Sequence, residues 1–391
     1  MYDVIVIGAG PAGNHAAYKL ADLGHKVAVL DSRENIGDKL CTGIVGKECI
    51  QQFPVKDLKI FSEANAATFV GPSGTSLRLT KPVSQAYIID RVAYIKSLAQ
   101  KAKFSGAKYF IGHNVVHVDV DDENVTVKSS NGKSSHVFKA SALVVASGFA
   151  SNIPKRLGLG TIGDYVTGSQ AEVMTSGLKE TEVYFGHHFA PGFFAWLVPT
   201  DKGKALLGVL SREKAGYHLN SLLEKLKLDG KITSVIKPPK RWGIPLRPLN
   251  KTYGDRVVVV GDAAGQAKPT TGGGIYYALL SADKAAETIS YGLLKNDLGR
   301  SILSQYEKKW KAILAKELRI GYYARRLYEM LNDNQLEELF KTIIVNGIHD
   351  KLIDDPNMSF DWHGNIIIKA MNFKIISKLI RASNPISTIL K

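Results

Sequence analysis

The sequence predicts a mixed α/β fold (α/β with α+β elements): a domain built on a parallel sheet, an inserted domain with an antiparallel β-sheet, and a helical carboxyl-terminal region. Three observations predict it. A strand, a glycine-rich turn and a helix open the chain, a second strand followed by glycines and a helix starts near residue 256, and short strands separated by turns precede that second unit. Such strand–helix alternation favours a parallel sheet covered by helices. We expect residues 1–155 together with 250–295 to form the first domain, 156–249 the second, and 296–391 the helical region.

The composition limits the class of protein. With 391 residues, 45% hydrophobic and 22% charged, the chain is typical of a globular protein of two or three domains. Its longest apolar runs, such as Val4–Ile7, are strand-sized and predict no transmembrane helix. No secretory signal precedes the first strand, so we expect a cytoplasmic protein. Two cysteines, Cys41 and Cys49, are too few for a disulfide framework or a four-thiolate iron–sulfur cluster.

The first segment is typical of a dinucleotide-binding unit. Tyr2–Ile7 is a short β-branched run, and helix-spaced alanines and leucines then lead to a second strand that ends at Asp31. The turn between them has the pattern Gly-x-Gly-x-x-Gly and contains Gly8, Gly10, Ala12 and Gly13. The first glycine permits the tight turn, the second admits a pyrophosphate, and the third lets helix and strand pack closely. With phosphates at the helix N-terminus and ribose hydroxyls on Asp31, this predicts a Rossmann-type site for FAD or NAD.

A second glycine turn favours FAD. The strand Arg256–Val260 runs into Gly261 and Asp262, and a proline-containing loop then leads to three consecutive glycines that open an alanine-rich helix. Asp262 can bind ribityl hydroxyls, while the N–H groups of the turn face the flavin or the pyrophosphate. An ordinary strand–helix corner, the alternative, needs no such glycine run. The expected cofactor-binding residues of this turn are Gly261, Asp262, Gly273, Gly274 and Ile275.

Together the two turns resemble those of the p-hydroxybenzoate hydroxylase-type flavoproteins. The helix beginning near Arg91 is similar to one in that superfamily, and the resemblance implies that Arg91 contacts FAD near its pyrophosphate or ribose; a surface salt bridge is the alternative. The segment Ala142–Ser151 resembles the strand that returns to the FAD domain. Aromatic hydroxylases usually carry Asp-Gly there, whereas this chain has Ser147-Gly148, which counts against a hydroxylase.

Within that superfamily the chain resembles the geranylgeranyl reductases, including those of archaeal membrane lipids. The segment Pro191-x-x-Phe194-x-Trp196-x-Val198-Pro199 is similar to their PxxYxWxFP pattern, with Phe for Tyr and Val for Phe. The stretch GDKLCTGIVG is similar to their cysteine-containing segment, which implies that Cys41 and Gly43 lie near the isoalloxazine. The resemblance covers Met1 to Ala286. It implies an FAD-dependent oxidoreductase that saturates C=C bonds of isoprenoid chains in phospholipid biosynthesis.

Chemistry gives an independent reason for an apolar pocket. An isolated prenyl C=C has no heteroatom to bind, so shape must hold it against flavin N5. We expect Phe194 and Trp196 to share the pocket face of an alternating strand, with Phe193, Ala195 and Leu197 on the other face; the alternative is that the whole run is core. Cys41 either shapes the pocket or takes part in proton delivery. The predicted catalytic residues are therefore Cys41, Phe194 and Trp196. No metal is expected, because His187-His188 has no third ligand nearby.

The net charge of the chain and its basic carboxyl-terminal segment indicate which partners it could bind. A net charge of +15 favours an anionic surface, such as acidic lipid or an acidic electron-donor protein, and no nucleic-acid module is visible. The external reductant, NADPH or reduced ferredoxin, stays open. Near the end, Lys374, Lys378 and Arg381 share one helical face opposite Phe373, Ile376, Leu379 and Ile380. This basic amphipathic helix can bind the inner face of a membrane peripherally or pack on the body.

Three other functions compete with the reductase. The first is a flavin monooxygenase or halogenase. The segment Phe194-x-Trp196-x-Val198-Pro199 also resembles the WxWxIP motif of flavin-dependent halogenases. Those enzymes use an active-site lysine, for which Lys81 is the candidate. A membrane quinone-reducing or electron-transfer flavoprotein is the second alternative. The third is a non-catalytic isoprenoid carrier that keeps FAD for stability.

Overall fold

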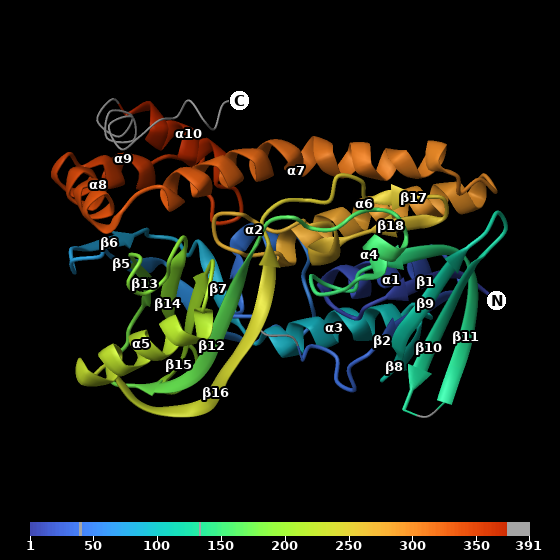
Figure 1. Ribbon diagram of the computed structural model, residues 1–391, viewed down its shortest axis with the longest axis horizontal. Helices are drawn as coiled ribbons and strands as arrows, with labels where there is room; N and C mark the ends of the chain where they lie inside the picture. The colour runs from blue at the N-terminus through green and yellow to red at the C-terminus, as the bar shows by residue number, and fades with distance from the viewer. Residues whose placement is uncertain (39–40, 133, 374–391) are drawn as a thin grey trace.

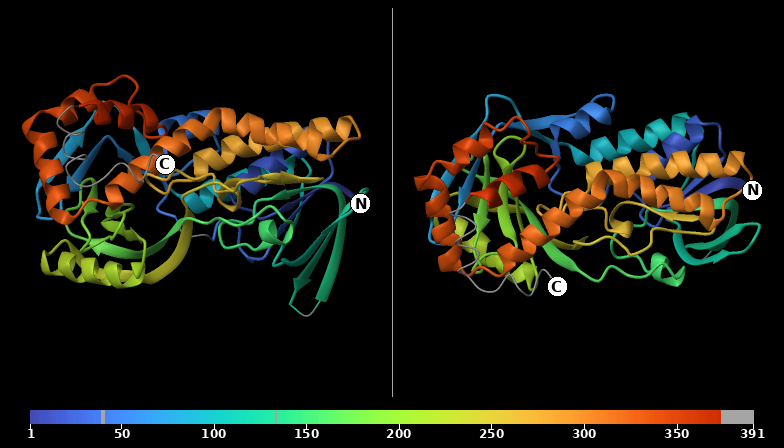
Figure 2. Two further views of the ribbon diagram at one scale, coloured as in Figure 1. Left: turned by 45° about the horizontal axis from the view of Figure 1, so that its top comes forward. Right: turned by 90° about the horizontal axis from the view of Figure 1, so that it is seen from above.

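The computed structural model describes residues 1–38, 41–132 and 134–373. A mainly parallel sheet with its helices and a mainly antiparallel sheet lie side by side, and the long helix α7 (Arg300–Glu329) runs along both (Figure 1). Figure 2 shows from two further directions that α7 spans the two parts. The predicted fold is therefore confirmed: a Rossmann-like sheet, a separate antiparallel sheet and carboxyl-terminal helices.

The first sheet has a parallel centre. Its strands run in the order β17, β18, β11, β1, β2, β8, with β10 and β9 added beside the first half of β11. The four contacts β18–β11, β11–β1, β1–β2 and β2–β8 are parallel. The strand bounds are β1 Tyr2–Ile7, β2 Val27–Asp31, β8 Lys108–Ile111, β9 Asn114–Val120, β10 Val125–Asn131, β11 Ser134–Val145, β17 Tyr253–Gly254 and β18 Val257–Val259.

Three helices cover one face of this sheet. They are α1 (Pro11–Asp22), α3 (Arg91–Phe104) and α6 (Ile275–Leu294), and their apolar sides form one buried cluster with the strands. The helix α3 starts at Arg91, as expected, because Asp90 caps it by accepting the N–H of Ala93 at 3.0 Å. The short elements beside this face are α2 Lys47–Gln52 and a small sheet of β3 Ile44–Gly46, β7 Ala86–Ile89 and β4 Ile60–Ala64. Two more, α4 Ile153–Arg156 and η1 Gly261–Ala264, contribute to the buried cluster on the opposite face.

The second sheet runs in the order β16, β12, β15, β14, β13, β5, β6. One face packs on helix α5 (Ala215–Leu228), and the other face carries Trp196 and Phe194. The strand bounds are β5 Ala66–Val70, β6 Ser76–Thr80, β12 Tyr165–Thr175, β13 Thr181–Phe185, β14 Phe194–Pro199, β15 Lys204–Ser211 and β16 Ile232–Pro245.

One segment lies elsewhere than the sequence predicts. Residues 66–80, inside the range 1–155 expected for the first domain, belong to the second sheet, because β5 pairs in parallel with β13. Residues 237–245, inside the range 156–249 expected for the second domain, form the end of β16 and pair with β12. Pro238 and Pro239 are compatible with a strand there because β16 lies at the sheet edge.

The carboxyl-terminal helices pack over the end of the second sheet. After α7 come α8 (Asp333–Val345), α9 (Ile348–Ile353) and α10 (Gly364–Asn372), which lie above β5 and β6 (Figure 1). Within the described ranges, the helices are all too short or too polar to cross a membrane. The predicted basic amphipathic helix with Lys374, Lys378 and Arg381 lies outside the described residues.

Candidate functional site

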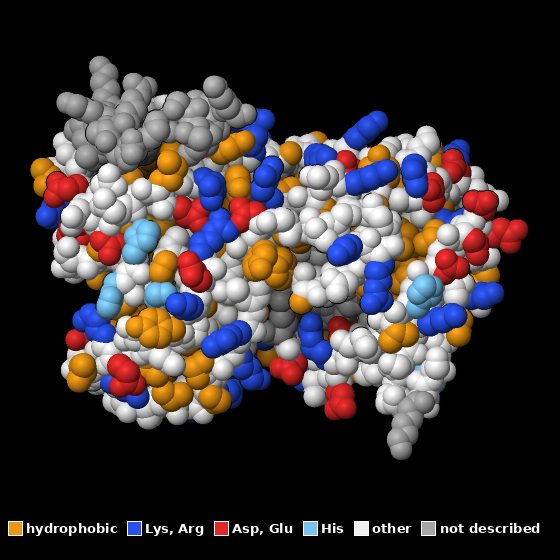
Figure 3. Space-filling view, in the orientation of Figure 1, with side chains coloured by type: hydrophobic (Ala, Val, Ile, Leu, Met, Phe, Trp, Pro, Cys, Tyr) orange, Lys and Arg blue, Asp and Glu red, His pale blue; other side chains and the backbone are white. Residues whose placement is uncertain are grey.

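One cavity of about 1040 Å³ brings the two predicted glycine turns together. It runs from the first turn, past the second, to the face of the second sheet that carries the aromatic strand. Figure 3 shows a hollow in the surface between the two parts of the molecule, and on this face basic and acidic side chains are interspersed. The predicted residues that line the cavity are Gly8, Gly10, Ala12, Asp31, Cys41, Gly43, Arg91, Phe194, Trp196, Gly261, Asp262, Gly273, Gly274 and Ile275.

In the first glycine turn, a Cβ would collide with the backbone at Gly8 and Gly13 but not at Gly10. Gly8 has a φ of +109°, and a Cβ on Gly13 would overlap the carbonyl oxygen of Gly8. Gly13 is the predicted residue that does not line the cavity, in agreement with a packing role. Gly10 differs, because a Cβ built there meets no described atom within 4 Å although Gly10 lines the cavity. Its glycine therefore leaves open space beside the N-terminus of α1.

Asp31 supports the turn from the end of β2. Its carboxylate accepts the N–H of Ala9 at 2.7 Å and the N–H of Arg33 at 2.8 Å, and it still lines the cavity. The side chain is therefore fixed in place, with a position suited to ribose hydroxyls. Beyond it the lining continues to Arg33 and His113, which extends the cavity on the side away from the second sheet.

The second glycine turn presents a helix N-terminus to the same cavity. The N-cap of α6 is Gly274, which has no side-chain capping bond, and the first turn of α6 has no acidic residue. The N-cap of α1, Gly10, is the same in both respects. Asp262 lies beside the start of α6, since a Cβ on Gly274 would come within 2.8 Å of its Oδ1. The N-termini of α1 and α6, neither of them capped by the side chain of its N-cap residue, thus face one space, which favours an anionic ligand.

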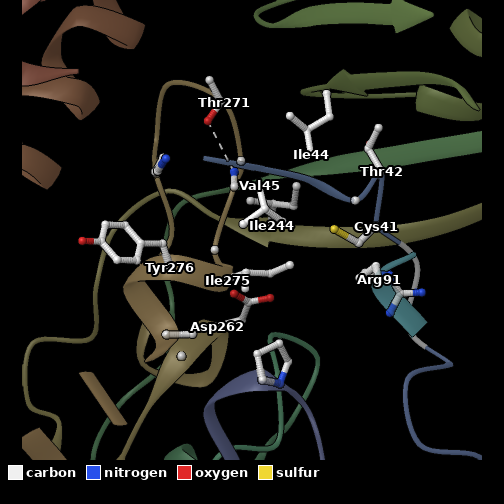
Figure 4. Close-up of a pocket in the computed structure, with 18 of the residues that line it drawn as sticks. Cys41, Thr42, Ile44, Val45, Arg91, Ile244, Asp262, Thr271, Ile275 and Tyr276 are labelled. Atoms are coloured by element: carbon white, nitrogen blue, oxygen red, sulfur yellow. Dashed lines mark hydrogen bonds between the residues drawn. The ribbon is translucent and has the colours of Figure 1, made fainter. Parts of the chain in front are cut away.

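Cys41 and Arg91 lie across the space from Asp262 and Ile275 (Figure 4). Arg91 donates from Nη1 to the carbonyl of Gly37 at 2.7 Å, which ties it to the segment before Cys41. Gly43 has a φ of +81°, and a Cβ there would come within 2.9 Å of the carbonyl oxygen of Ile89. The cysteine segment therefore turns sharply against β7, which directs Cys41 to the cavity.

The second cysteine has a different environment. Cys49 is fully buried in the main core, where burial and the carboxylate of Asp361 raise the pKa of its thiol. A thiol of raised pKa is a poor nucleophile and a poor proton donor at neutral pH. Of the two cysteines, Cys41 is the half-exposed one and the one that lines the cavity.

Trp196 is both buried and part of the cavity wall. Only 6% of it is exposed, its ring lies 5.9 Å from that of Phe194 and 6.4 Å from that of Trp242, and all three line the cavity. Two glycines make room for the indoles: a Cβ on Gly208 would overlap Trp196, and one on Gly168 would come within 2.6 Å of Trp242. Among the described residues, the indole Nε1 of Trp196 has no hydrogen-bond partner.

One expectation about this strand is wrong. Phe193 was expected on the face opposite Trp196, but it belongs to the same buried cluster, with its ring 5.0 Å from that of Phe194. The reason is that β14 begins only at Phe194, so Phe193 lies in the preceding turn, where strand alternation does not apply. Ala195 and Leu197 do lie on the other face, against α5.

The cavity has an apolar arm that the sequence did not predict. It extends past Trp196 along β13, β5 and β6, where the rings of Phe69 and Phe185 stack at 6.2 Å. Three alanines on the β4–β5 segment keep this arm open. We call it the substrate arm, and its apolar lining residues are Ala64, Ala66, Ala67, Phe69, Leu79, Val183, Phe185 and Phe194. The polar residues that line the cavity on the same segments are Asn65, Thr80, Lys81, Gln85 and Thr181.

A buried polar cluster at the carboxyl-terminal side was also missed. Lys268, which directly precedes Pro269, forms an ion pair with Asp361 at 3.2 Å, and both line the cavity. Burial lowers the pKa of Lys268, and burial together with Lys268 lowers the pKa of His363 to about 3. The available signal was that Asp361 is the last acidic residue of a long basic tail.

The residues present fit FAD. An extended dinucleotide needs an open glycine for its pyrophosphate, helix N-termini for its charge and a carboxylate for its ribose, and Gly10, the starts of α1 and α6, and Asp31 supply these along one continuous cavity. Bound there, FAD would provide hydride chemistry at the junction between the glycine turns and the substrate arm.

Comparison with known proteins gives the family. Residues 2–183 match the family described as pyridine nucleotide-disulphide oxidoreductase. The digeranylgeranylglycerophospholipid reductase of Methanocaldococcus jannaschii is 30% identical over 366 residues, which cover 88% of this chain and 90% of that protein. Digeranylgeranylglycerophospholipid reductase 2 of Methanothermobacter thermautotrophicus is 29% identical over 364 residues, covering 88% and 91%.

Solved structures agree on the fold. A geranylgeranyl bacteriochlorophyll reductase-like protein from Thermoplasma acidophilum superposes with a TM-score of 0.83 at 23% identity, over 98% of this chain and 99% of that one. The flavin-dependent halogenase CmlS superposes with a TM-score of 0.67 at 16% identity, over 97% and 78%. On the sequence relationship to the archaeal enzymes, the chain belongs to the geranylgeranyl reductase-like family of FAD-dependent oxidoreductases.

Proposed function

We propose that this protein saturates C=C bonds of geranylgeranyl or related isoprenoid chains carried by membrane lipids or their precursors. The observation that carries the proposal is the substrate arm, which joins the glycine turns in one cavity and is lined mainly by alanines, leucine, valine and phenylalanines. A prenyl chain offers no polar group along its length, so a long apolar wall is what can bind it. The names of the archaeal relatives support the same substrate class.

In this proposal the chain's own residues position the alkene and exclude water. Reduced FAD, when bound, would supply a hydride from N5 to one alkene carbon, and a proton reaches the other carbon. Phe194 and Trp196 hold the chain by contact alone, and the nearly complete burial of Trp196 keeps that wall dry. Cys41 lies at the junction between the substrate arm and the glycine turns, where it shapes the site or takes part in proton delivery.

The reductant and the membrane contact belong to the same proposal. A net charge of +15 suits an acidic donor such as reduced ferredoxin, and NADPH is the other reductant. A basic carboxyl-terminal tail suits peripheral contact with anionic lipid, where an isoprenoid substrate resides.

An anaerobic turnover experiment tests the proposal. The purified holoprotein is reduced chemically and mixed with a geranylgeranyl glycerolipid, and the lipid mass is followed together with flavin absorbance. We expect a gain of two hydrogens for each double bond reduced, in step with flavin reoxidation. Reoxidation by oxygen or by a quinone alone, with the lipid mass unchanged, would refute the proposal.

One observation keeps a halogenase as the second candidate: Lys81, the lysine that a halogenase would need, does line the cavity. The variant Lys81→Met separates the two functions, because Met keeps the length of the side chain and removes its charge. The reductase proposal expects isoprenoid reduction within about twofold of wild type, since an apolar chain gains little from the ammonium group. Halide-dependent oxidation that Lys81→Met abolishes would instead favour the halogenase.

A further inference from the structure

The carboxyl-terminal region supplies a wall of the cavity. Residues 353–366 run from the end of α9 to the first turn of α10, and seven of them line the same cavity as the glycine turns. Those residues are Ile353, Met358, Ser359, Phe360, Asp361, His363 and Ile366. The segment begins at the end of α9, which contacts β6, the strand that carries Leu79 of the substrate arm.

Within this segment, residues 359–364 form a strap that is bonded to both neighbouring walls. The carboxylate of Asp361 pairs with Lys268 of the second glycine turn and also accepts the N–H groups of Glu48 at 3.1 Å and Cys49 at 3.3 Å. The Asp361 carboxylate also requires glycine at position 46, because a Cβ there would overlap it. One buried carboxylate thus links the second glycine turn to the segment that follows Cys41.

Further contacts fix the two ends of the strap. Glu48 accepts hydrogen bonds from the Ser359 hydroxyl and from the Trp362 indole, both at 2.6 Å. At the other end, Glu317 of α7 accepts the N–H groups of His363 and Gly364, and the Thr270 hydroxyl bonds to His363 at 2.6 Å. The strap is therefore attached to α2, to α7 and to the second glycine turn.

A buried ion pair is costly to form and more costly to break. Lys268 and Asp361 have side chains only 6% and 2% exposed, so each charge depends on the other. The pair favours the arrangement in which the strap is seated. The apolar residues on either side of the strap, Met358 and Ile366, are held against the cavity as a result.

We propose that residues 353–366 are the specificity-determining wall of the substrate arm, in which Met358 and Ile366 contact the isoprenoid chain and Asp361 is the positioning residue. This inference rests on the proposed function and adds to it. A wall at this place limits how far a chain can slide past the reacting position, and so determines which of its double bonds are reduced.

Two isoleucines of α10 give a matched test. Ile366 lines the cavity, whereas Ile368 is 41% exposed and lies outside it. Ile366→Trp is expected to raise the KM for a geranylgeranyl lipid about tenfold and to leave more double bonds unreduced, because the larger ring fills the arm. Ile368→Trp is expected to behave like wild type, and both variants should retain wild-type FAD affinity, measured by titration of the apoprotein.

Ile366→Ala provides a second test, which does not require the fold to accept a bulky residue. It should enlarge the cavity and shift the products towards more complete reduction. If Ile366→Trp and Ile366→Ala both give the wild-type KM and product pattern, or if loss of FAD accounts for the whole effect, the inference is wrong. If wild type does not reduce the lipid at all, it is the proposed function that fails.

Asp361→Asn tests the positioning role. We expect a KM raised about tenfold and an altered product pattern, with FAD still bound, because the amide removes the carboxylate that is paired with the buried Lys268. Adding Lys268→Met should restore the KM at least partly, since an apolar side chain no longer requires a carboxylate. FAD release by Asp361→Asn, not reversed in the double variant, would show that the strap supports the cofactor and would overturn the assignment to substrate.

Discussion

Replacement of His363 by Gln should remove a pH dependence from the free energy of unfolding. In the folded protein, burial and the neighbouring cation of Lys268 lower the pKa of His363 from 6.5 to about 3. Its ring nitrogens are both occupied, Nε2 donating to the carbonyl of Phe360 at 2.9 Å and Nδ1 accepting from the Thr270 hydroxyl. The neutral imidazole is therefore the form that the fold stabilises.

The sign and size follow from proton linkage. Below pH 6.5 the unfolded chain binds a proton on this imidazole that the folded chain does not, so stability is complete above pH 6.5 and falls as the pH approaches 3. A solution at about pH 4.5 is about two pH units below the pKa of this imidazole in the unfolded chain. At about 1.36 kcal/mol for each unit, His363 should lower the stability by about 2.7 kcal/mol relative to neutral pH.

Urea unfolding followed by tryptophan fluorescence at pH 7.5 and pH 4.5 measures this difference. Carboxylates also titrate in the range, but they contribute equally to wild type and to His363→Gln, so the difference between the two proteins isolates His363. We expect that difference to change by about 2.7 kcal/mol between the two pH values. A change below about 0.5 kcal/mol would mean that His363 titrates alike in both states and would refute the reasoning.

The remaining predictions concern the cofactor turn and the aromatic wall. Gly10→Ala should leave the apoprotein as stable as wild type and weaken FAD binding at least about tenfold, because its Cβ enters open cavity space; Gly13→Ala should destabilise the fold by more than about 2 kcal/mol, because its Cβ overlaps Gly8. Thermal unfolding of the apoprotein and FAD titration separate the two, and equal effects on both measures would contradict the assignment. Trp196→Ala should lose alkene reduction and retain FAD, as absorbance of the purified protein would report. Loss of FAD would instead mean that the strand is structural core.

The parallel sheet and the cofactor turns could be predicted because their signals are local. The first turn needs glycine at defined positions next to one strand and one helix, and the structure places Gly8, Gly10 and Gly13 in the expected surroundings. The aromatic strand was harder to interpret, since a fully apolar run is typical of core and of a pocket wall alike. Trp196 is both, because it is buried in a hydrophobic cluster and also lines the cavity. Core and pocket wall are therefore not exclusive interpretations of this strand.

The placement of β5 and β6 could not be predicted because pairing across sheets is non-local. Residues 66–80 have the alternation of ordinary strands, and nothing within them specifies the partner. Their parallel contact with β13 brings together segments more than a hundred residues apart in the chain. This contact also creates the substrate arm, because it sets the alanines of β5 beside the phenylalanines of β13 and β14.

The same reasoning explains why the carboxyl-terminal wall was missed and why it matters. Lys268 was visible in the sequence as part of a cofactor turn, and a lysine in such a turn is most simply a surface residue. Only the fold shows that it is buried, and a buried ammonium requires an anion, which Asp361 supplies from the far end of the chain. An enzyme that only had to bind FAD would gain little from placing this ion pair between the second glycine turn and the last helices. A pocket that must close around a long apolar chain does gain, because this buried pair holds the wall in place while its two charges neutralise each other.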